Sequence, residues 1–137
     1  MINRLSVATI WVKDQNEALR FYTEKLGFEI RADVTARDYR WLTVGLKGQP
    51  DLEFQLAGLK PGGSLTQEDA DQLTKLVEAG KLGSGPWKTD DCQQTYETLK
   101  AKGVDFVQPP TDRPYGIIEA IFKDNSGNVM VLAQDKP

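Results

Sequence analysis

The sequence predicts an α+β fold in which two tandem βαβββ modules place their curved mixed sheets around a central cup. A strand-like segment followed by a helix with a polar residue at its start and a glycine at its end occurs twice along the chain. Each copy continues into three further strand-like segments, and one copy alone cannot bury both its helix and its sheet. We therefore expect the two copies to share one core within a single domain, residues 1–137.

The first module is expected at residues 1–57. Its opening strand alternates from Leu5 to Val12, and Asp14 then begins a helix by accepting a hydrogen bond from a free N–H group of the first turn. Gly27 ends this helix as a left-handed cap. Strands follow at about 28–34, 39–45 and 52–57, with Arg37-Asp38 as the turn between the first two.

Residues 58–83 are expected to form a linker with one polar helix, from about 67 to 79, on the outside of the domain. Its apolar stripe, the part expected to be buried, consists of Ala70, Leu73, Leu76 and Val77. The second module, at 84–135, repeats the first with a strand at about 85–89, a helix from Asp91 to Gly103, and strands at about 104–108, 116–123 and 128–134. Pro109 and Pro110 confine the chain there to a loop or an edge strand.

The absence of histidine excludes several kinds of chemistry. The 137 residues contain no histidine and one cysteine, so histidine-based nucleophile relays, histidine-ligated metals and internal disulfides are excluded. The net charge of −3 argues against a nucleic-acid partner. No apolar run approaches the roughly 20 residues needed to span a bilayer, and no signal peptide is visible, so we expect a cytoplasmic protein without membrane association.

Four segments together resemble the vicinal oxygen chelate superfamily, also called the glyoxalase/bleomycin-resistance/extradiol-dioxygenase superfamily. They are the opening strand at 7–14, the first-helix ending Phe21-Tyr22-Thr23-Glu24-Lys25-Leu26-Gly27-Phe28, the second-helix ending at 99–106 and the final hairpin at 116–128. The resemblance covers nearly all of 1–135. It implies a U-shaped cup that in most members holds a divalent metal on four ligands, mostly His and Glu.

Carried onto this chain, the four ligand positions of the family fall on Val7, Glu53, Ser84 and Val131. Only Glu53 could bind a metal, and one carboxylate does not define a metal site. The resemblance therefore favours a metal-free member with no cofactor, of the kind that binds a drug or metabolite. Glu53 remains the one candidate for a catalytic residue, as a general base.

The resemblance and the alternation of side chains along a strand together predict which residues line the cup. Trp11 could stack on a planar ligand, or could close the core. Trp41 and Trp87 are expected to pack or to lie at a dimer interface, and Cys92 to pack, although a thiol in the first turn of a helix can have a lowered pKa. The predicted ligand-binding residues are Val7, Thr9, Trp11, Glu53, Gln55, Ser84, Lys88, Val129, Val131 and Tyr115.

Three functions remain open from the sequence. The first is a homodimeric protein that binds a small, planar or apolar organic molecule without a metal. The second is a lyase, isomerase or dioxygenase-type enzyme of the same superfamily that uses Glu53 or an atypical metal site, for which Glu119 could supply a carboxylate. The third is a partner-binding module with a closed cup. The loops at 59–65 and 109–115 are expected to set specificity.

Overall fold

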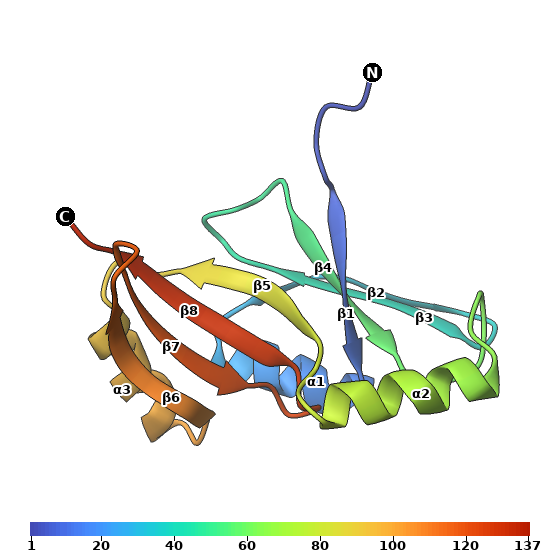
Figure 1. Cartoon of the computed structure of the whole chain (residues 1–137). Coiled ribbons are helices and arrows are strands. Elements are labelled where there is room, and N and C mark those ends of the chain that lie inside the picture. The colour runs from blue at the N-terminus through green and yellow to red at the C-terminus, as the bar shows by residue number, and fades with distance from the viewer.

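The structure is a computed structural model that describes all 137 residues and confirms the predicted α+β fold. The strands form two four-stranded mixed sheets, with strand orders β1-β4-β3-β2 and β5-β8-β7-β6, which lie side by side in Figure 1. The elements are β1 (Val7–Val12), α1 (Gln15–Arg20), η1 (Phe21–Lys25), β2 (Glu29–Ala36), β3 (Tyr39–Gly45), β4 (Glu53–Gly58), α2 (Gln67–Glu78), β5 (Gly83–Lys88), α3 (Cys92–Ala101), β6 (Asp105–Arg113), β7 (Ile117–Lys123) and β8 (Val129–Asp135).

The predicted helix caps are present. The side chain of Asp14 accepts a hydrogen bond from the N–H of Glu17, and that of Asp91 accepts one from the N–H of Gln94. Gly27 adopts a φ of 77° beyond the first helix, as expected for a left-handed cap. The first helix continues into the wider π form at η1, which its residue pattern does not predict.

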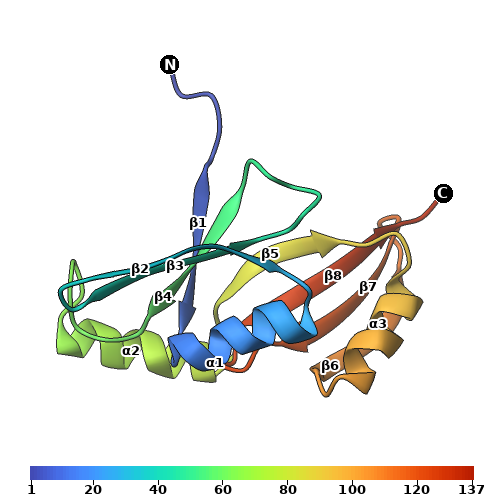
Figure 2. The same ribbon diagram turned by 180° about the vertical axis from the view of Figure 1, so that it is seen from behind.

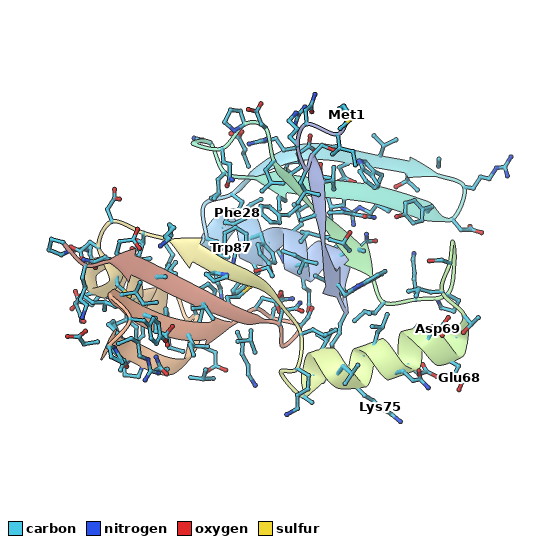
Figure 3. The ribbon with its side chains drawn as sticks, turned by 45° about the horizontal axis from the view of Figure 1, so that its top comes forward. Met1, Phe28, Glu68, Asp69, Lys75 and Trp87 are labelled. Carbon is cyan, nitrogen blue, oxygen red and sulfur yellow. The ribbon has the colours of Figure 1, made fainter.

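The helices α1, η1 and α3 lie on one face of the two sheets, and the core lies between this helix layer and the strands (Figure 2). Trp87 of β5 packs against Phe28 and Phe54 of the first module, with ring centroids 5.2 and 4.8 Å away, and Figure 3 shows Phe28 and Trp87 side by side. The core is therefore continuous across both modules, and the expected packing role of Trp87 is confirmed.

The opposite face of each sheet carries no helix. In β1 the side chains of Ile10 and Val12 point into the core, so the alternate residues Thr9 and Trp11 lie on this outer face. They pair in parallel register with Gln55 and Ala57 of β4. In the second module the proline-containing strand β6 is an edge strand, one of the two placements that Pro109 and Pro110 allow.

Helix α2 runs along the outside of the molecule beside the first sheet, and its C-terminal end lies against the turn between β7 and β8 (Figure 1). Ala70 and Val77 are buried as predicted, but the expected burial of Leu76 is wrong, because this side chain is 44% exposed. At the C-terminal end of the helix Glu78 forms an ion pair with Lys13. The apolar stripe of the helix is therefore covered only in part, at Ala70 and Val77. None of the helices combines the length and the apolar character that crossing a bilayer requires.

The turn between β7 and β8 joins the two modules through one buried carboxylate. Asp124 accepts hydrogen bonds from the backbone N–H groups of Ser126, Gly127 and Asn128 within the turn. Its other oxygen accepts a hydrogen bond of 2.8 Å from the hydroxyl of Tyr22 in η1. Burial, followed by the charge of Asp124 and this hydrogen bond, raises the pKa of Tyr22 well above its usual value.

Candidate functional site

A cavity of about 550 Å³ lies over the outer face of the first sheet. Strands β1 and β4 form its floor, and the tip of the β2–β3 hairpin and the loop that precedes α2 form its sides. Figures 1 and 2 both show the hairpin tip and this loop at the same end of the molecule. The lining residues are Thr9, Trp11, Gln15, Gln55, Ala57 and Gly58, with residues 36–40 and 60–65.

The floor of the cavity combines an aromatic surface with polar groups. Trp11 is half-buried, and its register partner Ala57 is small and leaves the space beside the indole open. The side chain of Gln55 is largely buried and donates a hydrogen bond of 2.5 Å to the hydroxyl of Tyr39, which is 49% exposed. Two aromatic side chains therefore border a cavity that also offers amide and hydroxyl groups.

Three basic residues, Arg37, Arg40 and Lys60, and one acidic residue, Asp38, border the cavity. Sequence reasoning assigned Arg37 and Asp38 to a turn, and assigned no role to Arg40 or Lys60. Only Lys60 belongs to the loop at 59–65, which was expected to shape specificity and lines the cavity through residues 60–65. The other loop expected to do so, at 109–115, contributes no lining residue.

The structure places the predicted first-module residues in two groups. Thr9, Trp11 and Gln55 line the cavity. Val7 and Glu53 pair with each other in the β1–β4 register, two residues before Thr9 and Gln55, and do not line the cavity. The carboxylate of Glu53 accepts a hydrogen bond of 2.7 Å from the hydroxyl of Thr43. Glu53 is therefore held by the neighbouring strand rather than by Lys88, which pairs with Asp135.

The residues at the four family positions do not fit a metal. Val7 and Val131 have no donor atom, and no group of three or more Asp, Glu, Cys or His side chains could hold an ion. Ser84 lies on the helix side, where its hydroxyl accepts a hydrogen bond of 2.8 Å from the indole of Trp87. A carboxylate and a hydroxyl on opposite faces of different sheets cannot form a coordination site.

The predicted residues of the second module do not reach the cavity. A register shift between Gly83 and Pro86 interrupts the alternation in β5, so the expectation that Ser84 shares a face with Lys88 is wrong. Lys88, Val129 and Val131 lie on the outer face of the second sheet, away from the lining residues of the first.

The outer surface of β6 and β7 carries its own polar cluster. Glu119 accepts hydrogen bonds from the guanidinium of Arg113, at 2.7 Å, and from the hydroxyl of Tyr115, at 3.2 Å. Partial desolvation, and then this hydrogen bond, raise the pKa of Tyr115. The carboxylate of Glu119 is therefore already paired with Arg113, and the neighbouring Tyr115 is 65% exposed.

The one cysteine belongs to the core. Cys92 is fully buried, as expected for a packing residue. The lowered thiol pKa that its position in the first helical turn suggested is wrong, because burial raises the pKa, and the nearby charges of Asp91 and Glu119 raise it further.

Comparisons with known proteins agree over nearly the whole chain. The family model of the Glyoxalase/Bleomycin resistance protein/Dioxygenase superfamily matches residues 4–132. The crystal structure of UcmS2 is 43% identical, with a TM-score of 0.92 over 98% of this chain and 100% of that one. TnmS3, an antibiotic binding protein from Streptomyces sp. CB03234, is 30% identical, with a TM-score of 0.76 over 98% of both chains. The uncharacterized protein YurT of Bacillus subtilis (strain 168) is 34% identical over 96% of this chain and 98% of its own.

Proposed function

This chain belongs to the Glyoxalase/Bleomycin resistance protein/Dioxygenase superfamily, and we propose that it binds a planar organic molecule of the antibiotic type without a metal. The observation that carries this proposal is the cavity of about 550 Å³ bordered by Trp11 and Tyr39. Its volume is in the range of small-molecule sites, which are typically about 300–1,000 Å³. The likeness to TnmS3, an antibiotic binding protein, supports the same class of ligand.

The arrangement of the floor favours a flat ligand. A ring system can stack on the half-buried indole of Trp11, because Ala57 beside it leaves room. The hydroxyl of Thr9 and the Tyr39–Gln55 pair can hydrogen-bond with polar atoms at the edge of such a ring system. In this proposal the flat ring system supplies most of the affinity, and the polar edge fixes its orientation.

The proposal is for binding without a metal, because the donor set is too small to hold one. Glu53 is the one carboxylate at the four positions where the family carries ligands, and it is already hydrogen-bonded to Thr43. No observation favours Glu53 as a general base over the binding function, since it does not line the cavity.

We also propose that a second copy of the chain completes the site. The first module is open above its cavity, and the outer face of the second sheet presents half-buried Val129, Val131 and Ile121. In a homodimer this face would cover the first sheet of the partner copy. The predicted residues Lys88, Val129, Val131 and Tyr115 would then reach the ligand from the other chain. The expected mass in sedimentation is twice 15.3 kDa, and a species of 15.3 kDa at micromolar concentration would contradict the dimer.

The binding proposal is tested by isothermal titration calorimetry with a panel of planar polycyclic antibiotics. For a compound that binds, Trp11→Leu is expected to raise the dissociation constant about 2- to 13-fold, because an aromatic pair contributes about 0.5–1.5 kcal/mol beyond its buried area. Trp41→Leu is the matched control, since Trp41 is also half-buried on the first sheet but does not line the cavity. Equal effects of the two substitutions would contradict the site.

The metal-free part of the proposal has its own measurement. Titrations of the same compound in EDTA and in added Zn²⁺ are expected to give one dissociation constant. Loss of binding in EDTA, together with a stoichiometric metal in the purified protein that Glu53→Gln removes, would replace the proposal with a metal-dependent function.

A further inference from the structure

We propose that the bound molecule carries an anionic group, a carboxylate or phenolate, and that Arg37 at the tip of the β2–β3 hairpin binds it together with Lys60. This inference rests on the proposed function, because it names the ligand chemistry that the same cavity selects. Two independent observations carry it, the charges at the rim of the cavity and the backbone conformation of Arg37.

The rim of the cavity has unpaired positive charge although the whole chain has a net charge of −3. The guanidinium of Arg40 is already engaged, since it donates two hydrogen bonds of 2.9 Å to the carboxylate of Asp33 and one of 2.6 Å to Asn16. Arg37 and Lys60 form no ion pair within 4 Å, and both are exposed.

After the Arg40–Asp33 pair is set aside, the lining residues carry two cations, Arg37 and Lys60, against the single carboxylate of Asp38. Asp38 is the residue next to Arg37, yet the two side chains do not pair within 4 Å. The rim therefore offers an anionic ligand an excess of free positive charge.

The backbone conformation of Arg37 supports a role for its side chain. Arg37 has a φ of 56°, and every other residue with a positive φ in this chain is a glycine. A turn of the chain in this conformation favours glycine, because the Cβ of another residue collides with the backbone. Such strained residues are concentrated at active sites and ligand sites, where the strain is kept for the sake of function. Arginine at this one position of the hairpin therefore indicates that the side chain is needed at the rim.

The floor and the rim together define an orientation for the ligand. The apolar rings would lie over Trp11 at the floor, and the anionic group would face Arg37 and Lys60 at the mouth. A guanidinium can bind a carboxylate through two parallel hydrogen bonds, which a point charge such as an ammonium does not provide. Because both cations are exposed, solvent screens them, and the gain expected from one of them is about fivefold in affinity.

The test uses two probes with the same rings and different charge, 2-naphthoate and 2-naphthamide, titrated into the ¹⁵N-labelled full chain. Binding is followed by the resonance of the Trp11 indole N–H, which is assigned by its loss in Trp11→Leu. We expect 2-naphthoate to bind more tightly than 2-naphthamide, and Arg37→Gln to weaken 2-naphthoate about fivefold while changing 2-naphthamide less than twofold. Adding Lys60→Gln is expected to remove the remaining preference for the anion.

The control is Lys47→Gln, which removes the same charge at an exposed residue away from the cavity and is expected to leave both dissociation constants unchanged. The preference for 2-naphthoate is also expected to shrink between 0.1 and 1 M salt, as the screening length falls from about 10 to about 3 Å. If 2-naphthamide binds as tightly as 2-naphthoate, or if Arg37→Gln and Lys47→Gln act alike, the anionic ligand is refuted while the cavity stands. If neither probe shifts the indole resonance, the proposed function itself fails, and this inference fails with it.

Discussion

Removal of the Tyr22 hydroxyl is expected to weaken the junction between the two modules. In Tyr22→Phe, the fully buried ring stays in place, but Asp124 loses its hydrogen bond of 2.8 Å from the hydroxyl. A hydrogen bond to a charged group contributes about 1.5–3 kcal/mol, so we expect the free energy of unfolding to fall by about 2 kcal/mol. At about 2.1 cal/mol/K per residue for the entropy of unfolding, this corresponds to a decrease of about 7 °C in Tm.

Asp124→Asn is expected to cost more, about 3–5 kcal/mol. Its oxygen can still accept the three backbone N–H groups of the turn, but the new amide NH₂ group faces the side-chain NH₂ group of Asn128, which now donates to Asp124 at 2.9 Å. The amide of Asn128 loses this bond, and its second hydrogen is already used at the carbonyl of Trp11. Removing one partner of a buried charged network costs more than the bond alone, because the other partners stay buried.

The assay for both variants is urea unfolding followed by circular dichroism, with Tyr96→Phe as the matched control. The hydroxyl of Tyr96 forms one exposed hydrogen bond with Lys100, so this substitution is expected to change stability by less than about 0.5 kcal/mol. If Tyr22→Phe is no more destabilising than Tyr96→Phe, or if Asp124→Asn is milder than Tyr22→Phe, the buried carboxylate does not hold the modules together as argued.

Three further outcomes follow from the same structure. Burial raises the pKa of Tyr22 above its ordinary value of 10, so above pH 10 the folded state holds one proton more than the unfolded state. The free energy of unfolding should therefore fall with pH by about 1.4 kcal/mol per unit more in wild type than in Tyr22→Phe. Urea titrations at pH 9 to 11 measure this difference. Arg37→Gly should raise Tm by about 3 °C in thermal unfolding, because glycine relieves about 1 kcal/mol of strain at a φ of 56°; an unchanged or lower Tm would contradict strain at this position. Gly127→Ala should lower the free energy of unfolding, measured in urea, by about 2–4 kcal/mol. Its φ is 113°, and a Cβ there would come within 2.5 Å of the carbonyl oxygen of Val77. Gly48→Ala is the control, because a Cβ at Gly48 meets open space.

The helices and strands that depend on local chemistry could be predicted from the sequence. Asp14 and Asp91 begin helices through their own side chains, and Gly27 ends the first one with its own backbone freedom. These signals act within a few residues, so a single sequence carries them completely. The repetition of the pattern then implied the tandem modules without any information on distant contacts.

What could not be predicted depends on contacts between distant segments. Ser84 turns to the helix side because β5 shifts its register against β8, and the neighbouring Gly83 lies so close to Val129 that a Cβ would come within 2.1 Å of its carbonyl oxygen. The pattern of residues within β5 does not predict this shift in register. The turn at Arg37 was visible, but its place at the rim of a cavity depends on how the loop at 60–65 folds beside it.

The junction also links the second module to the cavity, although no second-module residue lines it. β1 is the edge strand of the first sheet, so one row of its backbone groups has no strand partner. The turn between β7 and β8 supplies partners there, since Asn128 donates to the carbonyl of Trp11 at 2.7 Å and the hydroxyl of Ser126 accepts from the N–H of Lys13 at 2.9 Å. The backbone that carries the Trp11 indole is thus fixed by the same turn that Asp124 organises. A substitution at Asp124 is therefore expected to shift Trp11 and so to change the affinity for the ligand. Ligand binding then depends on both modules, although only the first one lines the cavity.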